Sequence, residues 1–261
     1  MKTAERQQAI LAAMLGGRTS IRELASIVGT SEATIRRDVD ALVRSGAVLR
    51  RHGSVELASE RTNEAPHAVR AVRDAQEKAA IARLASTLVR DGEFVVLDSG
   101  TTAEALAREL SSRRLDVLPL SLPSATILAE SPTVNLSVPG GDVRSGEGTF
   151  TGPLADRSIA DLRFDTFFLT CCGISASEGV TAYDVHDAAV KRRAIESAAR
   201  VIAVADGTKF RATARALVCN VDRLDFLITD DRASDRDVDE MRATGVRVEI
   251  VLTTERSTVA S

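Results

Sequence analysis

The sequence contains few aromatic side chains. Its 261 residues include no Trp and a single Tyr, and aromatic residues make up 3% of the total. Aliphatic side chains must therefore build the core, and the hydrophobic fraction of 44% is ordinary for a globular protein. No run of about 18 apolar residues is present, and the opening residues lack the apolar stretch of a secretory signal. We therefore expect a cytoplasmic protein without a membrane partner.

Cysteine and histidine are scarce as well. The three cysteines are an odd number, and Cys171 and Cys172 are adjacent in an apolar run, so structural disulfides are not expected. The three histidines are scattered and no C-x-x-C motif accompanies them, which disfavours a metal site. We expect neither a metal nor a cofactor. The cysteine pair is typical of small buried hydrophobes, and a redox sensor at Cys172 is the alternative.

Charge is unevenly distributed along the chain. The net charge is −3, but residues 1–53 hold nine Lys and Arg against five Asp and Glu, so the rest of the chain is acidic. A chain of this length suits a small module joined to a larger domain. A basic module on an acidic domain indicates that the module meets a polyanion.

Three short helices are predicted in the basic module. Gly16-Gly17 ends the first helix, and Ser20 with Glu23 three residues later forms a capping box for the second. Gly29-Thr30 makes a tight turn, and Ser31 caps the third helix. Two helices joined by a turn that contains glycine form a helix-turn-helix, whose last helix lies in the major groove of DNA.

The faces of these helices follow from the apolar spacing. Leu24, Ile27 and Val28 are expected to supply the buried face of the second helix. Ile35 and Val39 of the third helix face the core, so the polar residues at its start are left on the open side. Arginine suits that side because its planar fork fits guanine edges and phosphates. The residues of this helix predicted to contact DNA are Ser31, Glu32, Thr34, Arg36 and Arg37.

The segment AVLRRHGSVEL predicts a strand, a His-Gly turn and a returning strand, which together form the wing of a winged helix. Arg50, Arg51 and His52 lie near its tip, where they would contact the DNA backbone or the minor groove. Residues 1–57 are therefore predicted to form a winged helix-turn-helix domain that binds double-stranded DNA. Two alternatives are that the arginines form a solvated face and that the module contacts another protein.

The remaining chain is predicted to form a linker and one larger domain. Residues 58–75 are polar with one proline, and indicate a linker that leads into a helix. Over residues 76–261, apolar strands alternate with helices, which predicts an α/β domain with a mostly parallel sheet covered on both faces. Ligands of such sheets bind beyond the carboxyl ends of the strands. We expect this domain to bind an effector and to carry the contacts of a homo-oligomer.

The segment FVVLDSGTTAEALA gives the clearest indication of a ligand site. Its apolar strand ends at Asp98 and Ser99, and Gly100, Thr101 and Thr102 turn into a helix whose first N–H groups can surround a phosphate. Such a turn also serves as an ordinary corner between a strand and a helix. The other strand ends expected to converge on this corner contribute Ser121, Gly140, Gly141, Cys172 and Asp206 to Lys209.

Lysine is rare in this sequence. Four of the 34 basic residues are lysines, so arginine serves as the general surface cation. A lysine that follows a strand, as Lys209 does, is then expected to be chosen for its compact charge.

Both halves of the chain resemble the DeoR family of bacterial transcriptional repressors. The segment SEATIRRDVDALVRSGAVLRRHGSVEL is similar to the family pattern S-x-x-T-I-R-R-D-L followed by G-x-x-x-R-x-H-G-G, with Ser54 in place of the second glycine. The segments LDSGTT, PGG, FLTCCG and ADGTKF resemble motifs of the family's effector domain. The resemblance implies a ribose-5-phosphate isomerase-like fold and a phosphorylated sugar or related metabolite as effector.

The resemblance also implies roles for individual residues. Gly100, Thr101 and Thr102 would hold the phosphate, Asp98 would hold the sugar hydroxyls or the loop itself, and Lys209 would hold a ligand anion. Two departures concern the ligand's identity. The segment LSLP, residues 120–123, replaces the usual Thr-Asn-Ser, and Cys171-Cys172 replaces Ala-Asp. They favour a less hydroxylated ligand or another metabolite.

The predicted function is that of a repressor of carbohydrate-metabolism genes, without enzymatic activity. A homodimer or higher homo-oligomer would bind two operator half-sites, and the effector would release it. The alternative is a sugar-phosphate isomerase-like enzyme fused to a DNA-binding head, with Asp98 and Asp206 as candidate carboxylates. A third reading is a protein-binding scaffold.

Overall fold

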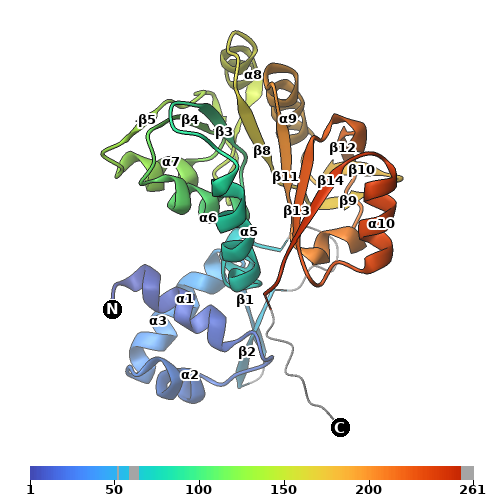
Figure 1. Ribbon diagram of the computed structural model, residues 1–261. Coiled ribbons are helices and arrows are strands. Elements are labelled where there is room, and N and C mark those ends of the chain that lie inside the picture. Colours follow the sequence, from blue (N-terminus) through green and yellow to red (C-terminus); the bar gives the residue numbers. More distant parts are fainter. Residues whose placement is uncertain (52, 59–64, 254–261) are drawn as a thin grey trace. The chain divides into compact units, whose positions relative to one another are not determined.

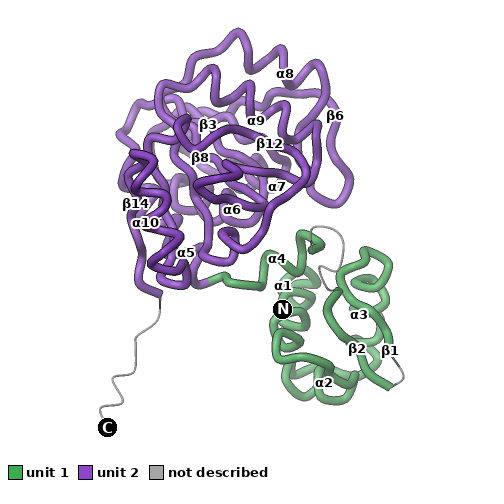
Figure 2. The backbone as a smooth tube through the Cα atoms, turned by 90° about the vertical axis from the view of Figure 1, so that its right-hand side faces the viewer, with its two compact units in different colours: residues 1–75 green, residues 76–261 purple. Residues whose placement is uncertain are grey.

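The computed structural model describes residues 1–51, 53–58 and 65–253. Contacts divide the chain into two compact units, Met1–Ala75 (unit 1) and Gln76–Ser261 (unit 2), which Figure 2 shows in two colours. Each unit is described by itself. His52, predicted to contact DNA, lies outside the described residues.

Unit 1 contains the predicted winged helix. The wing strands pair in antiparallel register, with Arg50 opposite Val55, and Thr19 adds a bridge to Val55 on the other side. The elements of unit 1 are α1 (Thr3–Ala13), α2 (Ile21–Val28), α3 (Glu32–Arg44), β1 (Val48–Arg51), β2 (Ser54–Leu57) and α4 (His67–Val72).

The predicted helix caps are present. Ser20 Oγ accepts the backbone N–H of Glu23 at 3.2 Å, and Glu23 Oε2 accepts the N–H of Ser20 at 2.7 Å, which completes the capping box of α2. Gly29 ends α2 in the left-handed conformation with a φ of 69°. Ser31 Oγ accepts the N–H of Thr34 at 3.2 Å and starts α3. The turn between the two helices is thus determined by local residues.

One expected core residue of unit 1 is exposed. Leu24 is fully buried and Val28 is half-buried, but Ile27 has 63% of its surface exposed. The helix α2 has only eight residues and packs through a stripe that includes Leu24, Ala25 and Val28. Ile27 falls outside this stripe. The expectation that Ile27 supplies the buried face was therefore wrong.

Part of the expected linker segment is folded onto unit 1. Residues 67–72 form α4, which contacts α1, and Val69 is fully buried in the same hydrophobic cluster as Leu11 and Ile35. A helix of six residues is too short to show a clear apolar period in the sequence. The compact unit accordingly continues to Ala75.

Unit 2 is built on the parallel sheet that the sequence predicts. Its seven strands lie in the order β14-β13-β11-β8-β3-β4-β5, and every neighbouring pair is parallel (Figure 1). The strands are β3 (Phe94–Leu97), β4 (Leu115–Pro119), β5 (Val134–Leu136), β8 (Thr166–Leu169), β11 (Val201–Val204), β13 (Phe226–Asp230) and β14 (Arg247–Val251).

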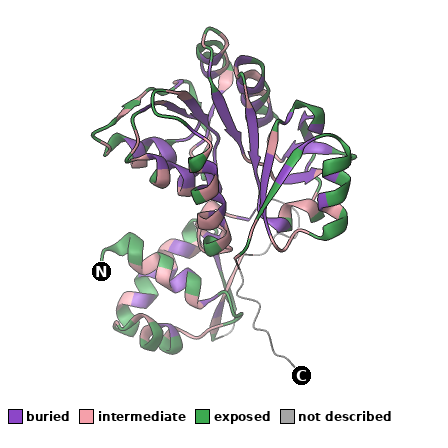
Figure 3. Cartoon of the chain, in the orientation of Figure 1, coloured by how far each residue is buried: buried purple, intermediate pink, exposed green. Residues whose placement is uncertain are grey.

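Helices cover both faces of this sheet, and Figure 3 shows its central strands as buried. Side chains alternate between the faces: Val95 and Leu97 pack with one group of helices, and Val96 packs with the other. The first group is α5 (Ala75–Thr87), α6 (Thr101–Leu110) and α7 (Leu122–Ala129), and the second is α8 (Gly152–Ala160), α9 (Val185–Ser197) and α10 (Asp235–Ala243).

Several short elements were not predicted. A three-stranded antiparallel sheet lies on the α8–α10 side, and a two-stranded ribbon precedes α8. These strands have two to four residues and include glycines, so they show no alternating pattern. They are β6 (Asp142–Val143), β7 (Phe150–Thr151), β9 (Gly173–Ser175), β10 (Gly179–Ala182) and β12 (Ala216–Cys219), and two 3₁₀ turns are η1 (Gly207–Arg211) and η2 (Val221–Arg223).

The winding of the chain through the sheet reverses between β3 and β8. From β3 the chain passes through α6 to β4 on one side, whereas from β8 it passes through α9 to β11 on the other. The two crossover helices lie on opposite faces of the sheet. Ligands of open parallel sheets bind at such a point of reversal, beyond the carboxyl ends of the strands. Among the described residues, no helix is long and apolar enough to cross a membrane.

Candidate functional site

The solvent face of α3 presents two guanidinium groups. Arg36 and Arg37 are exposed, while Ile35 and Val39 are fully buried, as the sequence predicts. Arg36 makes one ion pair within the helix, 3.1 Å to Glu32, and its side chain stays 63% exposed. An exposed pair of this kind contributes little energy, so the guanidinium remains available to a phosphate or a base.

The wing arginines are paired with carboxylates at the surface. Arg50 contacts Asp40 of α3, and Arg51 Nε lies 2.7 Å from Glu56 Oε1. Arg18 Nε lies 2.8 Å from the other oxygen of Glu56. Arg18 was missed at the sequence level because only the bridge between residues 19 and 55 brings it beside the wing. Three arginines therefore share this surface with two carboxylates.

Asp38 has a structural role in unit 1. Its carboxylate is 5% exposed and accepts two hydrogen bonds from Arg6, at 2.5 and 3.2 Å. The pair joins α1 to the buried side of α3. Asp38 thus fixes the helix whose opposite side carries Arg36.

The start of α6 lies directly after β3, at the point where the sheet reverses direction. Gly100 has a φ of 93° and a ψ of 173°, a conformation almost confined to glycine. No side chain among the described residues caps α6, so its first N–H groups face outward without a capping oxygen. Thr101 and Thr102 are 9% and 7% exposed. An uncapped helix start with two hydroxyls suits an anion.

Asp98 anchors this corner. It is fully buried, and its Oδ1 accepts the N–H of Ser99 at 2.7 Å. Its Oδ2 accepts the N–H and the hydroxyl of Thr170, at 2.9 and 3.0 Å. These bonds join the ends of β3 and β8. Of the two roles that the resemblance implied for Asp98, the geometry favours holding the loop.

A lysine that the sequence reasoning missed completes the anchor. Lys191 of α9 is 2% exposed, and its Nζ lies 3.0 Å from Asp98 Oδ2 and 3.2 Å from Asp187 Oδ2. It also donates to the carbonyl of Thr170 at 3.4 Å. Burial alone would lower the pKa of Lys191, but the charges of Asp187 and Asp98 raise the pKa well above its ordinary value. Lys191 is therefore charged at neutral pH.

A second lysine, Lys209, follows the end of β11, the strand next to β8. Lys209 Nζ lies 3.9 Å from Asp206 Oδ2, and its side chain is 28% exposed. Asp206 is 1% exposed and caps η1 by accepting the N–H of Thr208 at 3.1 Å. The Cys171 thiol interacts electrostatically with both Lys209 and Lys191. Strands β3, β8 and β11, which precede Asp98, Cys171 and Lys209, are neighbours in the sheet, and the shared role of these residues in ligand binding stays a prediction.

Two of the predicted strand ends have local explanations. The hydroxyl of Ser121 is buried without a hydrogen-bond partner among the described residues, and the N–H of Leu122 donates to the carbonyl of Gly148 at 2.8 Å. The chain around Gly148 therefore covers the start of α7. A Cβ on Gly141 would lie 2.6 Å from the carbonyl oxygen of Thr151, so close packing at the start of α8 accounts for this glycine. Beside Gly140 the space is open.

A third lysine, Lys78, lies in the same charged region. Lys78 is 6% exposed, and its charge interacts with that of Asp206. Lys78, Lys191 and Lys209 therefore all belong to the charged region at the strand ends. The argument from position after a strand singled out Lys209 alone, because Lys78 and Lys191 lie within α5 and α9.

We expect Cys171 to be chemically unreactive in the folded protein. Burial raises the pKa of its thiol to about 12, so at pH 8 only about 10⁻⁴ of it is thiolate. Iodoacetamide at pH 8 should modify Cys171 at least about 100-fold more slowly than in urea-unfolded protein, as measured by peptide mass spectrometry. Equal rates in folded and unfolded protein would contradict this environment for the thiol.

Comparison with known families covers both units. A model of the DeoR-like helix-turn-helix domain matches residues 6–61, and a model of the DeoR C terminal sensor domain matches residues 73–231. The chain belongs to the DeoR family. The resemblance found in the sequence motifs is thereby confirmed.

Several DeoR-family relatives match this chain over most of its length. The HTH-type transcriptional regulator GolR of Listeria innocua is 30% identical over 94% of this chain and 98% of its own. The HTH-type transcriptional repressor CsqR of Escherichia coli is 35% identical over 82% of each chain. The glycerol-3-phosphate regulon repressor of Escherichia coli is 30% identical over 88% of this chain and 92% of its own.

Among solved structures, ribose 5-phosphate isomerase A of Methanocaldococcus jannaschii is similar to part of this DeoR-family chain. The match has a TM-score of 0.40 and 15% identity, and it covers 52% of this chain and 54% of the isomerase. A likeness of this size carries no argument about ligand or activity.

Proposed function

We propose that this DeoR-family chain is a transcriptional repressor of carbohydrate-metabolism genes and that a phosphorylated sugar or a related metabolite releases it from its operator. The observation that carries the ligand class is the start of α6, which has no side-chain cap and lies at the point where the sheet reverses direction, directly after Gly100. The relatives that are named as repressors, among them that of the glycerol-3-phosphate regulon, support the regulatory role.

The position of the lysines supports a phosphate as the ligand group. Lys209 is partly exposed after the end of β11, whereas Lys191 is buried and bound to Asp98 and Asp187. In our proposal, Lys209, the hydroxyl of Thr101 and the N–H groups of Thr101 and Thr102 bind the phosphate directly. Lys191 holds the corner on which they stand. Leu120, which is fully buried, supplies no hydrogen bond to the ligand's hydroxyls.

The same site does not suit a general base. The carboxylates of the enzyme alternative are Asp98 and Asp206, which are 0% and 1% exposed. Asp98 is bound by Lys191 and Thr170. Asp206 accepts a hydrogen bond from Thr208. A general base must come within hydrogen-bond reach of the substrate. We therefore propose a binding protein without isomerase activity.

The proposed partner of unit 1 is double-stranded operator DNA, so we place the protein in the cytoplasm. A homodimer or higher homo-oligomer would bring two copies of α3 to two half-sites about one helical turn apart. An effector can release such a complex only by binding one arrangement more tightly than the other. Shifting the occupancy from 99:1 to 1:99 requires about 5.5 kcal/mol of differential affinity.

Release of the operator tests this function. The operator is first selected by the wild-type protein from random duplexes, and the ligand is found by a thermal-shift screen of phosphorylated sugars. Thr101→Val and Lys209→Met should each raise the ligand concentration for half-release at least about tenfold, because each removes a contact to a charged group. Fluorescence anisotropy with labelled operator should show an unchanged operator affinity without ligand.

Thr126→Val is the matched control for Thr101→Val. Thr126 is an exposed helical threonine whose hydroxyl donates to the carbonyl of Leu122 at 2.9 Å. This control should respond to ligand like the wild type. A normal response from Thr101→Val and Lys209→Met would place the ligand elsewhere.

A further inference from the structure

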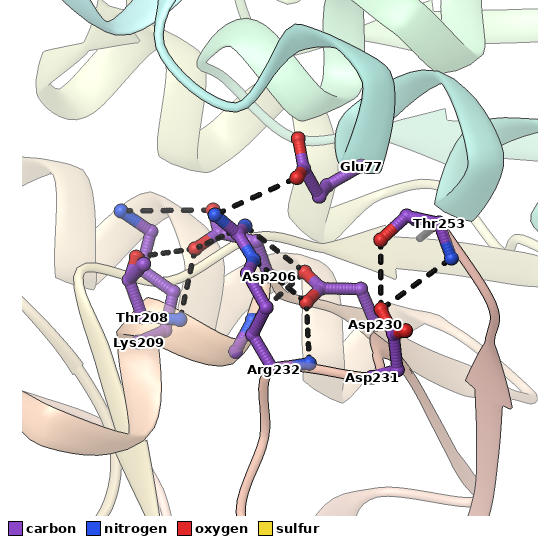
Figure 4. Close-up of polar contacts among 9 residues, drawn as sticks. Glu77, Asp206, Thr208, Lys209, Asp230, Asp231, Arg232 and Thr253 are labelled. Atoms are coloured by element: carbon purple, nitrogen blue, oxygen red, sulfur yellow. Dashed lines mark hydrogen bonds and ion pairs between the residues drawn. The ribbon is translucent and has the colours of Figure 1, made fainter. Parts of the chain in front are cut away.

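One guanidinium group connects three carboxylates at the ends of β11 and β13 (Figure 4). Arg232 Nε lies 2.9 Å from Asp230 Oδ1, and its Nη2 lies 3.2 Å from Asp230 Oδ2. The same Nη2 is 3.9 Å from Asp206 Oδ1, and Nη1 is 3.7 Å from Glu77 Oε1. Arg232 thus links β13, the end of β11 and the first turn of α5.

The sheet side of this cluster is tightly built. Asp230 is fully buried, and its Oδ2 accepts the N–H of Gly207 at 3.0 Å. A Cβ on Gly207 would lie 2.3 Å from the backbone nitrogen of Ala233, so the loops after β11 and β13 are in direct contact. Arg232 is therefore held firmly by Asp230. The contact of Arg232 with Glu77 is longer than that with Asp230, and the two side chains are 31% and 20% exposed. We therefore expect the contact with Glu77 to open more easily than that with Asp230.

Glu77 lies where the chain passes from one unit to the other. The division between the units falls after Ala75, the first residue of α5, and Glu77 is in the first turn of that helix. Asp74, just before α5, has a φ of 56° and is the one non-glycine residue with a positive φ in the described chain. Such a conformation costs about 1 kcal/mol or more and persists only where its surroundings hold it. The first turn of α5 thus follows a residue in a strained conformation, and its Glu77 is contacted by Arg232.

Asp206 needs a cation beside it. Burial alone would raise the pKa of Asp206, but the charge of Lys209, the hydrogen bonds from Thr208 and the charge of Lys78 together lower it, so the carboxylate is charged at neutral pH. A buried carboxylate that loses a cation is strongly destabilised. If a ligand anion takes Lys209, Arg232 is placed to replace it, since it lies the same 3.9 Å from Asp206.

We infer that Arg232 couples occupancy of the ligand site to the junction between the units. This inference rests on the proposed function, in which Lys209 binds the ligand anion. When the anion draws Lys209 away from Asp206, Arg232 shifts toward Asp206, its contact with Glu77 opens, and the first turn of α5 loosens. Arg232 and Glu77 are positioning residues in this account, because neither touches the ligand.

The experiment measures amide hydrogen exchange in the full chain at residues 79–82, whose N–H groups close the first turn of α5. Without ligand, Glu77→Gln and Arg232→Gln should each accelerate this exchange about two- to fivefold, the range of a partly exposed ion pair, and the double variant should exceed neither. Glu77→Gln leaves the buried contact of Arg232 with Asp230 intact. Arg236→Gln and Glu240→Gln remove a similar exposed pair, 2.8 Å apart on α10, and should leave this exchange unchanged.

Inorganic phosphate serves as the ligand probe. At saturation it should slow exchange at the start of α6 and bring residues 79–82 of the wild type to the rate of the Glu77→Gln variant. The variant should bind phosphate with an affinity within about threefold of the wild type, because Glu77 lies outside the ligand site.

Three results would overturn the inference, and they differ in what else they overturn. Additive effects of the two substitutions on hydrogen exchange in the double variant would refute the coupling alone. So would phosphate that slows exchange at the start of α6 without changing exchange at residues 79–82. Absence of any phosphate effect at α6 would refute the proposed function and the coupling with it.

Discussion

Replacing Lys191 with Met is expected to lower the free energy of unfolding of unit 2 by about 3–5 kcal/mol. The ammonium group of Lys191 lies within 3.2 Å of Asp98 and Asp187, and all three side chains are at most 7% exposed. Its removal leaves two carboxylates in a site from which water is excluded.

Amide exchange in β3 and β8 measures this effect and separates it from unit 1. Arg193→Met is the matched control, since Arg193 lies two residues further along α9 and also contacts two carboxylates, Asp156 and Glu196, at 3.2 and 2.6 Å. Its side chain is 37% exposed, so this variant should lose much less stability than Lys191→Met. Equal losses of unfolding free energy in the two variants would show that the Lys191 cluster does not hold the ends of β3 and β8 together.

Replacing Arg36 with Ala is expected to weaken binding to the selected operator about 10- to 100-fold and to change binding to random duplex DNA less than about threefold. Arg36 is exposed on α3 and makes a surface contact with Glu32. A bidentate contact with a guanine contributes about 1–3 kcal/mol of discrimination, which is the size of the expected loss. Competition binding at fixed salt, with labelled operator and unlabelled random DNA, measures both affinities.

Two further variants define the role of α3. Arg51→Ala should weaken operator and random DNA to a similar extent and reduce the dependence on salt by about one contact, because the wing is proposed to bind phosphates. Arg44→Ala, at the exposed last residue of α3, should have little effect on the preference for operator over random DNA. Loss of affinity without loss of preference in Arg36→Ala would assign Arg36 to the phosphate backbone.

Local signals in the sequence were sufficient to predict much of the fold. Ser20, Glu23 and Ser31 make the cap hydrogen bonds that their spacing indicates, because a cap involves residues at most three apart. The strands of the parallel sheet were predictable because they are apolar runs between helices. The antiparallel strands β9, β10 and β12 were not predicted, and β9 and β10 each begin with a glycine, which weakens a strand pattern.

The candidate ligand site was only partly predictable, for a related reason. The glycine turn before α6 is a local feature, and the structure places it at the reversal of the sheet. Lys191, however, meets Asp98 only because α9 packs against the sheet opposite the α6 side, and no sequence spacing encodes that contact. Ser121, whose position at a strand end suggested a ligand contact, has a buried hydroxyl without a hydrogen-bond partner among the described residues, and its role as a ligand contact stays a prediction.

The central claim is that the ligand site in unit 2 controls DNA binding by unit 1. It is tested most directly by isothermal titration of the phosphorylated ligand into the free protein and into the protein saturated with operator, at one salt concentration. The account predicts that operator weakens ligand binding by the same factor by which the ligand weakens operator binding. Equal ligand affinities with and without operator would contradict it.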